Sequence, residues 1–137
     1  MSVLTENYDA QGKAGALVSY PVAGTTHIYK GSLVCVNSDG YAVPGADSAD
    51  YAFVGVAYEE TNNASGSAGD RRVRLLKTGS FVYPAEGGAE QSDLGKLMYL
   101  SDDNTVADST IHSVPAGIVV EVPNSSQVRL RIDTQVK

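Results

Sequence analysis

The sequence has 137 residues, of which 42% are hydrophobic and 19% charged, and its formal net charge is −6. This length fits one domain with its own core and leaves little room for a second. The acidic balance argues against nucleic-acid binding, because phosphate contacts need a positive field. No apolar stretch approaches the roughly 20 residues that span a bilayer, so no membrane partner is expected.

Residues 1–13 are polar and follow neither helical nor strand periodicity. We interpret them as an N-terminal arm that precedes a domain over residues 14–137, and we expect the arm to order only against a partner. The alternative is a frayed terminus. Because the segment contains Glu6 and Asp9 and no apolar run, it does not resemble a signal peptide, and synthesis in a cytoplasm without the usual export is expected.

From Ala14 onward, short apolar runs alternate with Gly, Pro, Asn, Asp and Ser, which is typical of strands joined by turns. The first strands are expected at 16–20, 26–29, 33–36, 41–43 and 52–58. Asn37-Ser38-Asp39-Gly40 predicts a tight turn, because Asp-Gly supplies the positive φ that hairpin turns need. The segment 62–70 is a loop by composition.

The second half continues the pattern. Strands are expected at 72–75, 79–83, 97–100 and 105–107, with a hairpin of 117–122 and 127–132 around a turn at 123–126. A single helical turn is expected at 92–96, with Ser92 as its N-cap. Alternation predicts a core made of these residues: Phe53, Val73, Leu75, Leu97, Ile118, Val120, Val128, Leu130 and Ile132. The fold class is therefore all-β, a small single-domain barrel or sandwich with at most one or two short helical turns.

The residues that could carry catalysis or bind a metal are few and scattered. Cys35 lies in an apolar run and is expected to be buried, without the electropositive setting of a reactive thiol. His27 and His112 are the only histidines, and a metal site would need both to meet a carboxylate. We therefore expect no enzyme activity, no cofactor and no metal. A site assembled from distant carboxylates is the alternative.

The arginines suggest a binding surface. Arg71, Arg72 and Arg74 lie on one expected strand, and Arg129 and Arg131 lie on another. If these strands are neighbours, the side chains form a positive stripe on an acidic protein, suited to docking an acidic protein partner. The alternative is an ordinary solvated face. The arm supplies the remaining candidate contacts, namely Ser2, Val3, Leu4 and Tyr8.

The order of motifs resembles the capsid cement, or head decoration, family of tailed bacteriophages. The match runs over residues 15–133 and leaves the arm unmatched. Its segments are Tyr20–Ala23 with Ile28–Val34, Asp39–Ala46, Phe53–Ala57 with Glu59-Glu60, Gly69-Asp70 with Arg72–Arg74 and Gly79–Phe81, Asp93–Val106, and Pro115–Val122 with Val128–Asp133.

The resemblance implies a structural virion protein on the outer surface of the phage head, made in the bacterial cytoplasm. Such proteins bind the major capsid protein across subunit seams and stabilise the expanded shell against the pressure of packaged DNA. The implied fold is β-tulip or jelly-roll-like, and the implied self-association is a homotrimer, with a dimer as the alternative. The competing functional interpretation is a β-rich carbohydrate- or receptor-binding module displayed on a virion.

Overall fold

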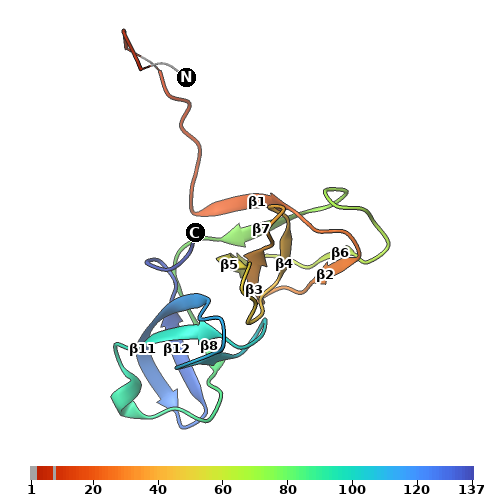
Figure 1. Ribbon diagram of the computed structural model, residues 1–137. Coiled ribbons are helices and arrows are strands. Elements are labelled where there is room, and N and C mark those ends of the chain that lie inside the picture. The colour runs from red at the N-terminus through yellow and green to blue at the C-terminus, as the bar shows by residue number, and fades with distance from the viewer. Residues whose placement is uncertain (1–2, 8) are drawn as a thin grey trace.

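The computed structural model describes residues 3–7 and 9–137, and in these residues it is nearly all β (Figure 1). The prediction of an all-β domain is confirmed, since the described residues contain twelve strands and one short 3₁₀ turn. The elements are β1 (Leu17–Pro21), β2 (Thr26–Ile28), β3 (Leu33–Val36), β4 (Ala42–Pro44), β5 (Ala52–Ala57), β6 (Thr61–Asn63), β7 (Arg72–Leu76), β8 (Ser80–Pro84), η1 (Gln91–Asp93), β9 (Leu97–Leu100), β10 (Val106–Ala107), β11 (Pro115–Asn124) and β12 (Gln127–Arg131).

The strands form three sheets with antiparallel neighbours. The N-terminal sheet has the order β1-β7-β5-β3-β4, the C-terminal sheet has the order β10-β9-β11-β12-β8, and β2 with β6 forms a short ribbon. The two large sheets make the two lobes of Figure 1. The C-terminal sheet curls so that an isolated bridge joins Ala85 to Val106, which brings its two edge strands together at one end.

The N-terminal sheet is the middle layer of the molecule, because both of its faces are covered. One face places Leu33 and Phe53 in a core shared with Met98 and Leu130 of the C-terminal sheet. The other face packs beneath the ribbon, in a second cluster that includes Val54 and Leu75. One hydrophobic core therefore continues from the N-terminal sheet into the C-terminal sheet.

A β-bulge in β5 lets this strand serve both cores. The register with β3 shifts between Val34 and Cys35, and Gly55 takes a φ of 149° at this point. A Cβ on Gly55 would lie 2.6 Å from the carbonyl oxygen of Leu76, so glycine is the residue that allows β7 to approach.

Most strands and turns lie where the sequence places them, but Asn62 and Asn63 of the expected loop at 62–70 belong to β6, which pairs with β2. In the turn before β4, the Asn37 side-chain oxygen accepts hydrogen bonds from the Asp39 and Tyr41 amides, and Gly40 has a φ of 85°. The expected helical turn is present but begins earlier, because the N-cap is Glu90 and not Ser92. The Glu90 amide donates to the Asp93 carboxylate at 2.9 Å and fixes this start. Within the described residues, no helix is long and apolar enough to cross a bilayer.

The core prediction is wrong at three positions, all in or beside β11. Val120 is 41% exposed, while Leu97 and Ile118 are only half-buried. Leu97 lies on the outward-facing side of β9, where burial alternates regularly with Met98 and Leu100 inward. In β11 the register is irregular, since this strand shifts against β9 between Pro115 and Gly117 and against β12 between Val119 and Glu121. Each shift changes which side chains face inward, and Val119 is the buried residue in place of Val120.

Candidate partner-binding surface

The arginines do not form the single stripe that the sequence analysis considered. β7 belongs to the N-terminal sheet, between β1 and β5, whereas β12 belongs to the C-terminal sheet, between β11 and β8. The condition that the two strands are neighbours is therefore not met. All five side chains are nevertheless exposed: Arg71, Arg72, Arg74, Arg129 and Arg131. The structure offers two separate arginine pairs on two sheets, with Arg71 just before the first.

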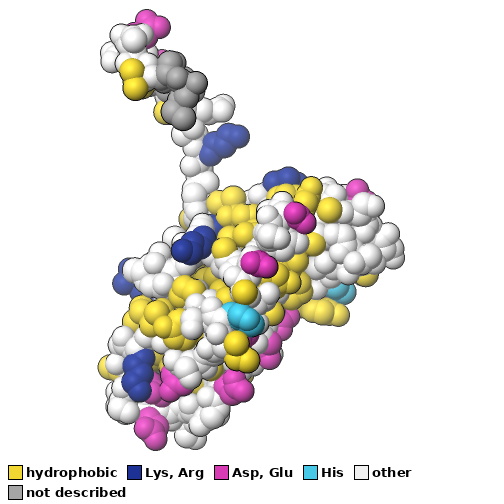
Figure 2. Space-filling view, viewed as in Figure 1, with side chains coloured by type: hydrophobic (Ala, Val, Ile, Leu, Met, Phe, Trp, Pro, Cys, Tyr) yellow, Lys and Arg dark blue, Asp and Glu magenta, His cyan; other side chains and the backbone are white. Residues whose placement is uncertain are grey.

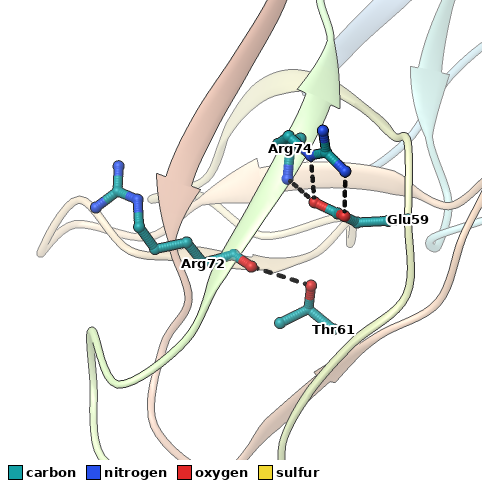
Figure 3. Close-up of polar contacts among 4 residues, drawn as sticks. All are labelled: Glu59, Thr61, Arg72 and Arg74. Carbon is teal, nitrogen blue, oxygen red and sulfur yellow. Dashed lines mark hydrogen bonds and ion pairs between the residues drawn. The ribbon is translucent and has the colours of Figure 1, made fainter.

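Arg74 is held by a carboxylate from the segment after β5 (Figure 3). Its Nε donates to Glu59 Oε2 at 3.0 Å, its Nη2 donates to Oε1 at 2.8 Å, and its backbone amide donates to Oε2 at 2.9 Å. The guanidinium also lies over the Tyr58 ring, 5.1 Å from its centroid. Hydrogen bonds from Arg74 lower the pKa of Glu59 below its usual value, so the pair is ionised at neutral pH. This bidentate ion pair with Glu59 leaves little uncompensated charge at Arg74.

Arg72 lies two residues earlier on the same strand and turns the other way, toward β1 (Figure 3). Its Nε donates to Ser19 Oγ at 2.8 Å and its Nη2 donates to the Ser19 carbonyl oxygen at 2.9 Å. Its own carbonyl accepts from the Thr61 hydroxyl at 3.1 Å. Neutral groups orient this guanidinium, and the ion pairs among the described residues do not include it. Arg72 therefore presents a fixed and uncompensated positive charge at the surface.

The second pair, on β12, is compensated locally. Arg129 Nε donates to Ser80 Oγ at 2.8 Å, and its Nη1 lies 3.6 Å from the Glu121 carboxylate. Arg131 Nε lies 3.2 Å from Asp133 Oδ2. Because these pairs are exposed, each contributes little to stability and can be exchanged for a partner's carboxylate at small cost.

The groups considered for catalysis lie apart. Cys35 is buried in the shared core, and burial raises the pKa of its thiol to about 12, so the thiolate is not available at neutral pH. His27 stacks on Tyr29 with ring centroids 4.1 Å apart and lies 2.6 Å from Glu60 Oε2. His112 lies beside Asp47, on a different part of the chain. Among residues 3–7 and 9–137, no cluster of three His, Cys, Asp or Glu side chains could hold a metal ion.

Sequence reasoning missed a groove of about 610 Å³ between the two large sheets. One wall is the segment from Phe81 to Tyr83 on β8, and the opposite wall comes from the ends of β5 and β7. The lining residues are Lys30, Gly31, Val56, Ala57, Tyr58, Leu76, Phe81, Val82 and Tyr83. The Tyr83 hydroxyl donates to the Gly31 carbonyl oxygen at 2.8 Å across the groove. Hydrophobic surface runs across the middle of the molecule, where the lobes meet (Figure 2).

The arm stands clear of both lobes, and hydrophobic atoms are visible near its far end (Figures 1 and 2). Val3 is 86% exposed and Leu4 is 73% exposed. The other two predicted contact residues of the arm, Ser2 and Tyr8, lie outside the described residues. Val3 and Leu4 are therefore the large apolar side chains that the described part of the arm offers to a partner.

The fold and this surface define a small all-β domain with an apolar groove, separate arginine pairs and an exposed arm. No family model matches the chain, and no curated protein matches it either. Among solved structures, the chain is similar to the crystal structure of the head fibre gp8.5 N base of bacteriophage phi29. The identity is 16% and the TM-score is 0.49, over 88% of this chain and 98% of that one. A likeness this distant carries no argument about function.

Proposed function

We propose that this protein is a structural component of a tailed-bacteriophage virion that decorates the outer surface of the head. It binds the major capsid protein across subunit seams and stabilises the expanded shell against the pressure of packaged DNA. The observation that carries the proposal is the ordered series of sequence motifs that resembles the cement family. The phi29 likeness is not part of this support.

The position of those motifs in the structure supports the proposal. They fall on the framework of the two large sheets, from Tyr20 at the end of β1 to Ile132 just after β12. The resemblance is therefore carried by residues of the scaffold, that is, by strands and the turns that join them. A structural protein needs such a scaffold and no reactive centre.

The physical mechanism is additive binding by a rigid body. The shared core ties both large sheets together, so forces on one lobe are transmitted to the other. A copy that spans a seam contacts several capsid subunits at once, and modest contacts then combine through a high effective concentration. Self-association as a homotrimer, which the resemblance implies, multiplies these contacts again. A dimer would do so to a smaller degree.

The test is electron microscopy of heads assembled with and without the protein. The proposal predicts added density on the outer face of heads that contain it. Decoration that is absent at saturating protein, together with specific binding on a glycan array, would favour the carbohydrate-binding module instead.

The arginines of β7 are expected to contribute to this binding. Replacing Arg72 and Arg74 by Ala should lower the occupancy of heads, because Arg72 offers a free positive charge and Arg74 can exchange its carboxylate partner. The melting temperature should fall little, since an exposed ion pair contributes only about 0–1 kcal/mol. Occupancy is measured by sedimentation of heads with labelled protein.

The matched control replaces Lys96 and Lys137 by Ala, which removes two exposed cations elsewhere and changes the net charge equally. If both double variants bind as well as the parent, the β7 arginines have no role in docking. If both lose binding equally, overall charge is responsible and not this surface.

A further inference from the structure

β8 has an open edge, as its hydrogen bonds to β12 show. The Ala85 amide donates to the Ser126 carbonyl oxygen, and the Ile132 amide donates to the Gly79 carbonyl oxygen. In an antiparallel ladder such bonds recur at every second residue, so the odd-numbered residues of β8 face β12. The amides and carbonyls of Ser80 and Val82 therefore point the other way. In the described part of the chain, no strand pairs with β8 on that side.

The open edge borders the apolar groove. Phe81, Val82 and Tyr83 line the groove on the β8 side, and Val82 is 47% exposed. An added strand requires unpaired backbone groups beside an apolar groove. The backbone of β8 would form hydrogen bonds with the added strand, and the groove would accept every second side chain of that strand. A long open edge would favour uncontrolled association, whereas this one is limited to a few residues and ends at the Ala85–Val106 bridge.

We propose that the N-terminal arm of a second copy occupies this site, adding a strand to β8 and burying Val3 and Leu4 in the groove. The arm has the required character, since these two side chains are uncovered in its own chain. Residues 3–7 also contain Glu6, and Lys30 at the groove supplies the complementary charge. The inference goes beyond head binding, because it concerns how copies of this chain join.

The direction of the arm favours exchange between copies over folding back. Residues 9–15 contain no turn or bend, and they lead away from the lobes (Figure 1). The chain from Leu4 to the start of β1 at Leu17 can span up to about 45 Å when extended. The arm therefore carries its apolar end away from its own groove and within reach of a neighbour's.

The experiment uses full-length single-cysteine additions in separate preparations. A Leu4→Cys chain is mixed with a Val82→Cys chain under mild oxidation, and disulfide-linked dimers are counted. A Leu4→Cys chain mixed with Val120→Cys is the control, because Val120 is similarly exposed but lies on β11, which has strands on both sides. Cys35 is buried with a raised thiol pKa and does not compete.

We expect the 4–82 link to form on the order of tenfold or more faster than the 4–120 link, since docking raises the effective concentration of the two thiols. Val82→Lys should weaken self-association by about tenfold, because a charged edge residue opposes strand addition. Val120→Lys should leave self-association unchanged. Both are measured by sedimentation of the folded variants.

The proposed arm exchange would be overturned if the two disulfide links formed at equal rates. It would also be overturned if the full-length chain stayed monomeric at all concentrations. A link that forms only within a Leu4→Cys/Val82→Cys double variant would show that the arm occupies its own groove, and this too would overturn it. Head decoration can persist in any of these cases. The receptor for the arm would then lie on the shell, so failure here is distinguishable from failure of the proposed function.

Discussion

A protein lacking residues 2–13 is expected to fold normally and to leave phage heads undecorated. The fold should survive because the first strand begins at Leu17 and both hydrophobic clusters are built from residues after the arm. Decoration should be lost because the arm joins neighbouring copies through Val3 and Leu4, whose burial in a neighbour's groove would contribute about 1.5–3 kcal/mol for each side chain, and separate copies lose the multivalent contact with the shell. Losing both contacts weakens binding by two orders of magnitude or more at each site.

The measurement is occupancy of heads by the truncated and full-length chains, with circular dichroism to establish that both are folded. A full-length Val3→Ser, Leu4→Ser variant is the matched control for chain length. It should also fail to decorate, because it keeps the arm and removes only its apolar side chains. Truncated protein that binds as tightly as the parent would end the role proposed for the arm.

Phe53→Ala should remove about 3–5 kcal/mol from the free energy of unfolding, a large part of the roughly 5–15 kcal/mol typical of a domain. Phe53 is 1% exposed and packs in the core shared by the two large sheets. Its carbonyl oxygen also accepts a hydrogen bond from the amide of Lys137, so the C-terminus is tied to β5. Truncating this side chain leaves a cavity at the junction of the lobes.

Urea unfolding followed by two probes checks this result, one probe in each lobe. Val120→Ala is the control, and it should change stability by less than about 0.5 kcal/mol because Val120 is exposed. We expect a single transition in which both lobes unfold together. Two separate transitions, or a Phe53→Ala midpoint equal to that of the control, would show that the shared core does not join the sheets.

The sequence was sufficient to predict much of the local structure. Alternation in 127–132 and the Asp-Gly turn at 39–40 depend on side-chain periodicity and backbone conformation, which neighbouring residues determine. Both are confirmed, as β12 and as the turn before β4. Cys35 is buried, as its apolar surroundings predicted.

The sequence was not sufficient to predict which strands become neighbours. The arginine stripe required β7 beside β12, but pairing between distant strands depends on the whole topology, and these two entered different sheets. Val120 was placed in the core together with Ile118, whereas β11 shifts its register between Pro115 and Gly117 and buries Val119 instead. The groove arises only where two sheets meet, so no local pattern could indicate it.

The most direct test of the central claim is cryo-electron microscopy of heads that lack this protein, imaged before and after the purified chain is added back. The account predicts regularly spaced density on the outside of the expanded shell, over the seams between capsid subunits, and better retention of packaged DNA on heating. Heads that look the same and release DNA equally with and without the protein would contradict the account.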